Sequence, residues 1–444
     1  MREMKDSGLQ WIGSIPHNWV IRKLKYLFSS AKGLSITKAH LIDKGLPVIN
    51  YGQIHSKNNT GVTLLPSFLR FIPNSFGTGN SKSKVQKYDF VFADTSEDYE
   101  GCGNCVYKRD DSELFAGYHT IILHSLYKED RRFFAYLFST DCWRKQIREN
   151  CSGIKVFSIT QDNLRNSFAF VPPLSEQKKI ADYLDSKCSQ IDSIIEKQKQ
   201  IIEKLKEYKT SLITEVVTKG LDPNAKMKDS GVEWIGNYPQ NWSLLKLKHN
   251  FGLKGRIGWQ GLRSDEFIDD GPFLITGTDF VNGYVNWNTC AHISEERYMQ
   301  DSNIHIKEND LLITKDGTIG KVAIVKNCPP QVSLNSGVAI IRHTGLFPCF
   351  SKYFYYILKS NQFDLWFKLS DNGNSTIKHL TQEKFYNFIY TCPPEIEQRQ
   401  IADYLDSKLL LIDESIAKKE QIIEKLQEYK KSLVYEVVTG KREV

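Results

Sequence analysis

The chain has 444 residues, of which 41% are apolar and 25% charged, and its formal net charge at pH 7 is +7. This length predicts two to three domains with sizeable cores, and no apolar run is long enough to predict a membrane span or a secretory signal. Nine cysteines without a disulfide-scaffold spacing indicate a reducing compartment, so we expect a cytoplasmic protein. The positive charge is compatible with a polyanionic partner but does not require one.

The opening segment of the chain returns in its second half. MKDSGLQWIGSIPHNW begins at Met4, and MKDSGVEWIGNYPQNW begins at Met227, so that Trp19 matches Trp242. This recurrence predicts a tandem duplication. Because Trp beside Pro and Gly is usually buried, we expect each opening to be a packing clamp rather than a binding site.

Each opening is followed by short apolar or β-branched runs that are separated by Gly, Asn, Asp and Pro. These runs predict the strands of a compact mixed domain. The two halves keep the pattern but differ in their residues, so we expect one framework with two different surfaces. The predicted strands are residues 47–50, 89–92, 120–123, 273–276, 310–313 and 338–341, and the predicted aromatic helices are residues 131–149 and 351–369.

Two long segments with nearly the same text, residues 171–220 and 392–440, follow these bodies. A Pro-Pro pair precedes each segment, a Gly ends it, and no Pro or Gly lies between, which is typical of a helix. At about 1.5 Å per residue, a helix of roughly 45 residues is on the order of 65 Å long. A rod of this length has little core of its own, so we expect the two rods to pack together.

Apolar residues in both segments recur at steps of four and three, a heptad pattern that predicts helix pairing. Two copies of one surface pair most simply about a two-fold axis, and an axis perpendicular to the rods makes them antiparallel. The predicted seam comprises Ile180, Leu184, Ile191, Leu205, Leu212, Ile401, Leu405, Ile412, Leu426 and Leu433, together with Ile194, Ile201, Tyr208, Ile422 and Tyr429.

The sequence therefore predicts an α+β protein in which an antiparallel coiled coil separates two mixed α/β domains. The first domain is residues 1–171 and the second is residues 221–392, with helices at residues 172–220 and 393–444. A coiled coil that only mediates pairing is an alternative at this point.

No catalytic motif is evident in the sequence. The run from Gly317 to Lys321 is too short between its glycines for a phosphate loop, and Val322 stands where Ser or Thr is needed. Cys102 and Cys105 form a CxxC, but no second pair completes a zinc site. We therefore expect no active site, metal or cofactor in this chain.

The loops of the two bodies offer candidate contacts to DNA. The Gly-rich turn at residues 317–320 predicts a loop whose amides and cations hold phosphates or reach base edges, although a solvated hairpin turn fits equally well. The corresponding stretch of the first body, residues 94–103, is acidic and offers acceptors for cytosine amino groups. The predicted contacts are Lys82, Lys84, Arg109, Lys155, Lys315, Thr318, Lys321, Asn374 and Lys378.

Both openings read W-I-G-x-x-P-x-x-W, and both helices begin with P-P-x-x-E-Q-x-x-I-A-x-x-L-D, at residues 172–185 and 393–406. In these motifs the chain resembles the specificity (S) subunit of type I restriction–modification systems. The resemblance covers essentially the whole chain. It implies two target-recognition domains that each read half of a split, non-palindromic site in double-stranded DNA, with the helices as the ruler between them.

The resemblance also implies partners: two adenine-methylating (M) subunits docked on the helices, and motor–nuclease (R) subunits. S-adenosylmethionine, Mg and ATP are then expected on those partners. Two other classes of function remain open from the sequence, namely a single-chain methyltransferase or nuclease with recognition domains, and a coiled-coil adaptor without a DNA role.

Overall fold

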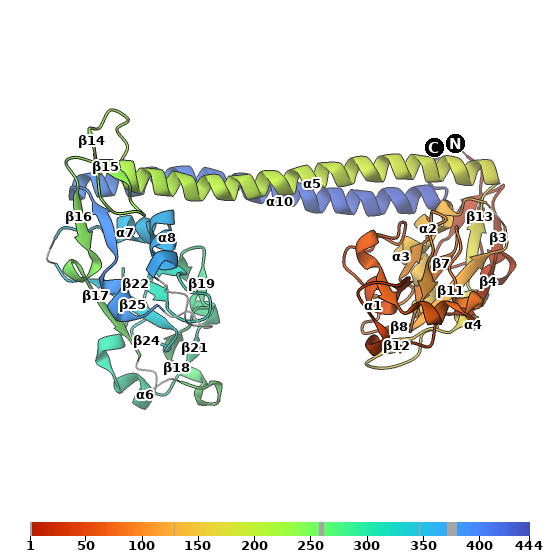
Figure 1. The fold of residues 1–444 in the computed structure, drawn as a ribbon, viewed down its shortest axis with the longest axis horizontal. Helices are drawn as coiled ribbons and strands as arrows, with labels where there is room; N and C mark the ends of the chain where they lie inside the picture. Colours follow the sequence, from red (N-terminus) through yellow and green to blue (C-terminus); the bar gives the residue numbers. More distant parts are fainter. Residues whose placement is uncertain (1, 128, 257–261, 346, 371–379) are drawn as a thin grey trace. The chain divides into compact units, whose positions relative to one another are not determined.

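A computed structural model describes residues 2–127, 129–256, 262–345, 347–370 and 380–444 of the chain (Figure 1). The chain divides into two compact units, of which unit 1 comprises Met1–Gln198 and Gln421–Val444, and unit 2 comprises Lys199–Glu420. Each unit therefore holds one of the predicted domains together with a part of each long helix.

The first domain contains short strands and helices. Its strands are β1 (Met4–Asp6), β2 (Ser14–Pro16), β3 (Val20–Lys23), β4 (Phe28–Lys32), β5 (Leu46–Ile49), β6 (Arg70–Ile72), β7 (Phe90–Ala93), β8 (Thr95–Ser96), β9 (Cys105–Tyr107), β10 (Phe115–Ala116), β11 (Thr120–Ser125), β12 (Phe157–Ser158) and β13 (Phe168–Val171). Its helices are α1 (Tyr51–Ile54), α2 (Arg132–Ser139), α3 (Asp141–Arg148) and α4 (Gln161–Asn166), and α5 (Leu174–Lys219) follows.

The second domain repeats this order. Its strands are β14 (Met227–Asp229), β15 (Asn237–Pro239), β16 (Ser243–Lys246), β17 (Phe251–Gly255), β18 (Ile268–Ile275), β19 (Phe280–Val281), β20 (Tyr284–Val285), β21 (Ala291–His292), β22 (Leu311–Thr314), β23 (Val322–Ile324), β24 (Val332–Leu334), β25 (Val338–His343) and β26 (Ile389–Cys392). Its helices are α6 (Glu295–Met299), α7 (Ser351–Leu358), α8 (Asn361–Ser370) and α9 (Gln382–Tyr386), and α10 (Glu395–Val438) follows.

The two domains share one sheet topology, which confirms the predicted duplication. The sheet order β4-β11-β7-β9 of the first domain recurs as β17-β25-β22-β23 in the second, where β20 and β19 extend it. The order β10-β5-β6 recurs as β24-β18-β21, with a parallel first pair in both domains. The predicted strands all lie within one residue of observed ones or inside them, because alternating apolar residues bounded by turn formers leave little freedom in assignment.

Aromatic side chains join each central sheet to the helices that cover it. In unit 1, Phe90 of β7 packs against Phe138 of α2 with ring centroids 5.0 Å apart. In unit 2, Phe251 of β17 stacks on Phe354 of α7 at 4.1 Å. Trp19 and Trp242 are both buried in these cores, as the clamp interpretation expected.

The aromatic helix predicted at residues 131–149 is in fact two helices, and so is its counterpart in the second domain. Thr140 lies between α2 and α3 in an extended conformation, and its hydroxyl accepts a hydrogen bond from the Trp143 amide. A threonine that caps a helix in this way ends the preceding one, because its backbone leaves the helical region. Ser360 lies at the corresponding break between α7 and α8.

Within each unit the parts of α5 and α10 run antiparallel. In unit 1 the early α5 residues Cys188 and Ile191 share a core with Leu433 and Val434 near the end of α10. In unit 2 the late part of α5 shares a core with the early part of α10, through Leu212, Ile213, Leu409 and Ile412.

Two ion pairs show the same symmetry. Lys430 Nζ lies 2.7 Å from the Asp192 carboxylate in unit 1, and Lys209 Nζ lies 2.6 Å from the Asp413 carboxylate in unit 2. Each pair is the image of the other under the repeat, since Asp192 matches Asp413 and Lys209 matches Lys430. The same contact between the two helices is therefore made once in each unit.

The inward face of the long helices repeats every seven residues, as the heptad pattern predicted, but one of its two rows lies one residue later than predicted. The first row is as predicted, since Leu184, Ile191 and Leu212 of α5 are buried and Leu205 is half-buried. The second row contains the buried Cys188, Ile195 and Ile202, whereas the predicted Ile194, Ile201 and Tyr208 are 43%, 38% and 56% exposed. The same shift occurs on α10, where Ile422 and Tyr429 are exposed and Ile423 is half-buried.

The other predicted seam residues lie at or near this face. Eight of the ten seam residues in the first predicted set are buried, and the other two, Leu205 and Leu426, are half-buried.

A buried aspartate holds the same turn in each domain but has a different partner. The Asp89 carboxylate accepts a hydrogen bond of 2.7 Å from the Gln86 amide, and the Asp310 carboxylate accepts one of 2.7 Å from the Lys307 amide. Asp89 then pairs with the imidazole of His124 at 2.6 Å. In the second domain the guanidinium of Arg342 binds Asp310 through Nε at 2.8 Å.

We expect unit 1 to lose stability as the pH rises, because of His124. Burial lowers the pKa of His124, but the hydrogen bond and charge of Asp89 outweigh it, so the pKa is raised above its ordinary value. The stabilisation is complete below about pH 6.5 and is lost as the pH rises through the folded-state pKa. We expect the free energy of unfolding of unit 1 to fall by roughly 1 kcal/mol, the net value of one intramolecular hydrogen bond.

Chemical denaturation at several pH values, followed by hydrogen exchange in each unit, measures this loss. The matched variant is His124→Arg, which places in the first domain the guanidinium that the second domain has at Arg342. It should remove the dependence between pH 6 and 9. An equal slope in wild type and variant would show that His124 is not the titrating group.

Candidate nucleic-acid interface

The ends of three strands meet at one edge of each domain, and we call this edge the rim. In the first domain the Asp94 amide, just after β7, donates to the His119 carbonyl, just before β11, at 3.1 Å. In the second domain the Lys315 amide, just after β22, donates to the Gly337 carbonyl at 2.9 Å. Asp94 and Lys315 therefore occupy the same backbone position and carry opposite charges.

A second hydrogen bond at the rim supports this equivalence. The Asp94 carbonyl accepts from the Ile159 amide at 2.8 Å, and the Lys315 carbonyl accepts from the Leu380 amide at 3.2 Å. These amides precede Thr160 and Thr381, which cap α4 and α9. One hydrogen-bonded scaffold thus presents an acidic side chain in one domain and a basic one in the other.

The acidic loop of the first rim is largely organised by contacts within the protein. Asp98 accepts from the Gly101 amide at 2.5 Å, and Glu100 pairs with Arg148 at 3.1 Å. Asp94 pairs with His119 at 3.3 Å. Glu97, Asp98 and Glu100 are nevertheless exposed, and the reading of cytosine amino groups by this loop stays a prediction.

The Gly-rich turn of the second rim joins β22 to β23, as the sequence predicted. Thr314 braces it, since the Thr314 hydroxyl accepts from the Lys321 amide at 3.0 Å. Gly317 and Gly320 have φ values of +67° and +85°, a region that favours glycine and gives the loop its tight form. Thr318 and Lys321 are exposed on this turn, and Lys315 is half-exposed at its base.

The predicted cations of the first domain lie in different surroundings. Lys82, Lys84 and Lys155 are exposed, and Lys84 pairs with Glu113 at 3.0 Å. Arg109 binds Asp185 of α5 at 3.0 Å, which gives it a partner away from the rim. The phosphate contacts of these residues stay predictions, and Asn374 and Lys378 lie outside the described residues.

We expect Lys321→Ala to weaken DNA binding and to lower the slope of log affinity against log salt by about one, the contribution of one phosphate contact. Fluorescence titration of a DNA duplex at several salt concentrations measures both quantities. Lys326→Ala is the control, because Lys326 follows the far end of β23 and its ammonium is held by Asn309. An unchanged slope for Lys321→Ala would remove this residue from the phosphate set.

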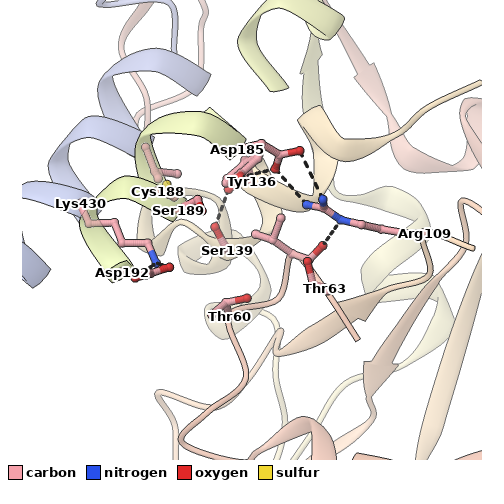
Figure 2. Close-up of a pocket in the computed structure, with 12 residues that line it drawn as sticks. Thr60, Thr63, Arg109, Tyr136, Ser139, Asp185, Cys188, Ser189, Asp192 and Lys430 are labelled. Carbon is pink, nitrogen blue, oxygen red and sulfur yellow. Dashed lines mark hydrogen bonds and ion pairs between the residues drawn. The ribbon is translucent and has the colours of Figure 1, made fainter. Parts of the chain in front are cut away.

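Each domain is anchored to a long helix by one aspartate. In unit 1 the Asp185 carboxylate of α5 accepts from Tyr136 Oη at 2.6 Å and from Arg109 at 3.0 Å (Figure 2). It also accepts from Arg132 at 2.6 Å. In unit 2 the Asp406 carboxylate of α10 accepts from Tyr356 and Lys352 of α7.

The charge state of the first anchor follows from these contacts. Burial raises the pKa of Asp185, but hydrogen bonds from Arg109, Tyr136 and Arg132 outweigh it and lower the pKa below its usual value. The anchor is therefore a carboxylate. A groove of about 380 Å³ opens beside it, between the first domain and the helix pair of unit 1, and includes Thr60, Ser139 and Asp192 (Figure 2).

The repeated P-P-x-x-E-Q-x-x-I-A-x-x-L-D motif has a structural explanation. The buried Gln177 amide donates to the Pro172 carbonyl at 2.8 Å, and Gln398 donates to the Pro393 carbonyl at 2.8 Å, which fixes the turn into each helix. The Ile and Leu of the motif are core residues, and its last Asp is the domain anchor. The motif therefore encodes the junction of domain and helix rather than base recognition.

Sequence reasoning did not single out His119, the Asp89–His124 pair or the anchor aspartates. Only the recurrence of Asp185 as Asp406 was visible in the sequence. Cys102 and Cys105 are buried, and burial raises the pKa of each thiol to about 12. Within the described ranges, no three His, Cys, Asp or Glu side chains gather as a metal site, and no helix is long and apolar enough to span a membrane.

The chain matches the family model described as "Type I restriction modification DNA specificity domain" at residues 16–214 and 260–428. The chain belongs to this family. The match covers both domains and most of both long helices, in agreement with the internal repeat.

Curated relatives carry related names. The EcoBI specificity subunit of Escherichia coli is 28% identical over 48% of this chain, and the aligned part spans only 45% of that protein. The putative MjaX specificity subunit of Methanocaldococcus jannaschii is 23% identical over 97% of this chain and 95% of its own length.

Solved structures of this family share the fold. A chain from a study of complex assembly and conformational transition of the type I R-M system aligns with a TM-score of 0.72 at 15% identity, over 96% of this chain and 99% of that chain. The HsdS subunit of Thermoanaerobacter tengcongensis aligns with a TM-score of 0.55 at 14% identity, over 98% of this chain and all of that one.

Proposed function

We propose that this protein is the non-catalytic DNA specificity subunit of a type I restriction–modification complex. Each rim reads one half of a split, non-palindromic site in double-stranded DNA, and the paired helices set the unread gap. The observation that carries this proposal is the pair of equivalent backbone positions at Asp94 and Lys315, where one scaffold presents opposite chemistry. Acceptors and donors at one place in two copies of a fold select different base edges.

The partners are those that the family implies. Two M subunits dock on the helices and carry S-adenosylmethionine, and R subunits with Mg and ATP join for cleavage. The near-identical text of the two helices supports equal docking of two identical subunits, whereas the divergent rims support reading of two unlike half-sites.

The deciding experiment is a domain exchange followed by methylation mapping. The chain is co-expressed with its cognate M subunit, and methylated adenines are mapped across the genome to define the target. Residues 4–171 are then replaced by the first domain of another family member that keeps the Tyr136 and Arg132 positions, so that the Asp185 anchor is retained.

We expect the exchange to change one half of the target and to leave the other half and the gap as they were. The reverse exchange of residues 227–392 is the matched control and should change only the other half. A change in both halves after either exchange, or methylation without a split motif, would contradict the proposal.

A further inference from the structure

His119 of the first rim has an unusual backbone conformation for a residue with a side chain. Its φ is +54°, in the left-handed region, although 56% of its side chain is exposed. Core packing therefore does not account for this conformation. Residues in sparsely populated backbone regions gather at binding sites, where the surrounding structure fixes a side chain in one place.

Neighbouring polar groups fix the orientation of the His119 ring. Its Nδ1 lies 3.3 Å from Asp94 Oδ1 and 3.2 Å from Thr95 Oγ1. The Thr95 hydroxyl itself donates to Asp94 at 2.8 Å. Because a carboxylate only accepts, Nδ1 carries the proton that faces Asp94, and Nε2 of the uncharged ring is an acceptor.

Two tyrosines frame the same ring. Tyr51 and Tyr118 meet it edge-on, with centroids 5.3 Å and 6.0 Å away and interplanar angles of 76° and 80°. Behind Thr95, His55 Nε2 lies 2.8 Å from the Thr95 carbonyl, which holds this part of the loop. More than half of the imidazole is thus exposed, while its Nδ1 is held by polar partners and two tyrosine rings flank it.

We propose that His119 reads one base pair of the first half-site, by accepting a hydrogen bond at Nε2 from an exocyclic amino group of adenine or cytosine. Adenine N6 and cytosine N4 are the amino donors of the major groove. Asp94 is a positioning residue, because it selects the tautomer. This assignment rests on the proposed function, and it specifies the chemical group of the base that the first rim recognises. The second rim has Lys315 and Gly337 at these places and offers a donor instead.

The first test is methylation mapping with His119→Gly in the full chain, co-expressed with the M subunit. Glycine adopts the left-handed region readily and stands at the equivalent position, Gly337, of the second rim, so the variant keeps the backbone and removes the acceptor. We expect one position of the first half-site to become degenerate while the second half-site is unchanged. His17→Gly, a substitution of an exposed histidine in the same domain, should leave the motif intact.

The second test measures binding to a duplex in which the degenerate base has lost its amino group, with purine in place of adenine or the 4-deamino analogue in place of cytosine. Wild-type complex should lose affinity about fivefold to tenfold, the value of one hydrogen bond left unmade. His119→Gly should show no further loss, even if the variant methylates poorly.

Asp94→Asn separates positioning from a merely structural role. The amide donates to Nδ1, so the ring carries its proton on Nε2 and should prefer guanine at the same position. A wild-type complex without a split motif would overturn the proposed function and this assignment together. A split motif that His119→Gly reads with full stringency, or an affinity loss equal in variant and wild type, would overturn this assignment alone.

Discussion

Removal of residues 421–444 should unfold the first domain while the second domain stays folded. The end of α10 places Leu433, Val434, Val437 and Val438 in the core of unit 1, each at most 8% exposed. Burial of one such aliphatic side chain contributes about 1.5–3 kcal/mol, so four contribute roughly 6–12 kcal/mol. A domain is stable by about 5–15 kcal/mol in total, and this loss is of the same size.

Hydrogen exchange read by mass spectrometry distinguishes the two units in one sample. Amides of residues 4–171 should lose their protection, and those of residues 227–392 should keep it. Removal of only Lys441–Val444 is the matched control, because these four residues are exposed. Equal protection of the first domain in the long and short truncations would show that the end of α10 does not complete its core.

Gly440 marks the point in the chain that separates the long truncation, which should unfold the first domain, from the short one, which should not. It ends α10 with φ at +71°, and a Cβ placed on it would lie 2.3 Å from Pro16 and 3.3 Å from Trp19. Gly220 has the same relation to Trp242 in unit 2, at 3.0 Å. The repeated Trp/Pro opening is therefore a seat for the end of a long helix, and the helix that ends on each domain comes from the other repeat.

Much of the fold was predictable because its signals are local. Pro-Pro starts, Gly ends and apolar steps define the long helices, and β-branched runs define the strands. The aromatic helices were predicted as single because Thr140 and Ser360 look like ordinary helix residues in sequence. One row of the seam was predicted one residue too early because Ile194 and Ile195, like Ile201 and Ile202, are adjacent apolar residues that sequence alone does not rank.

The site was less predictable because its contacts join distant segments. Arg109 resembled a phosphate ligand, but its guanidinium meets Asp185, which no local pattern indicates. His119 was overlooked because its left-handed backbone and its contact with Asp94 appear only once the strands align. The opposite charges of the two loops were visible in the sequence, and the structure adds that Asp94 and Lys315 are equivalent positions.

Asp185→Ala should lower the free energy of unfolding of unit 1 by about 3 kcal/mol. Breaking a buried ion pair costs about 3–5 kcal/mol because the partner charge is left unpaired. The lower value applies because Asp185 is 25% exposed and Arg132 keeps Asp130 and Asp182 as partners. Chemical denaturation of the full chain, with hydrogen exchange to assign the transition to unit 1, measures this loss.

Asp182→Ala is the matched control for this anchor, since Asp182 lies on the same helix, also binds Arg132 and is 54% exposed. It should cost less than about 1 kcal/mol, as exposed pairs do. The dependence of the stability of unit 1 on pH in the acidic range gives a second test of this anchor. A lowered pKa means that Asp185 stabilises unit 1 above about pH 4 and that this contribution disappears as the pH falls through the folded-state pKa.

Wild-type unit 1 should therefore lose stability on acidification more steeply than Asp185→Ala. Asp406→Ala should move the same loss to unit 2, because Asp406 anchors that domain through Tyr356 and Lys352. Equal costs for the two α5 variants would mean that the domain is held to its helix by apolar packing alone. Unequal costs, each confined to one unit, would mean that a single repeated carboxylate fixes each DNA-reading domain to its helix pair.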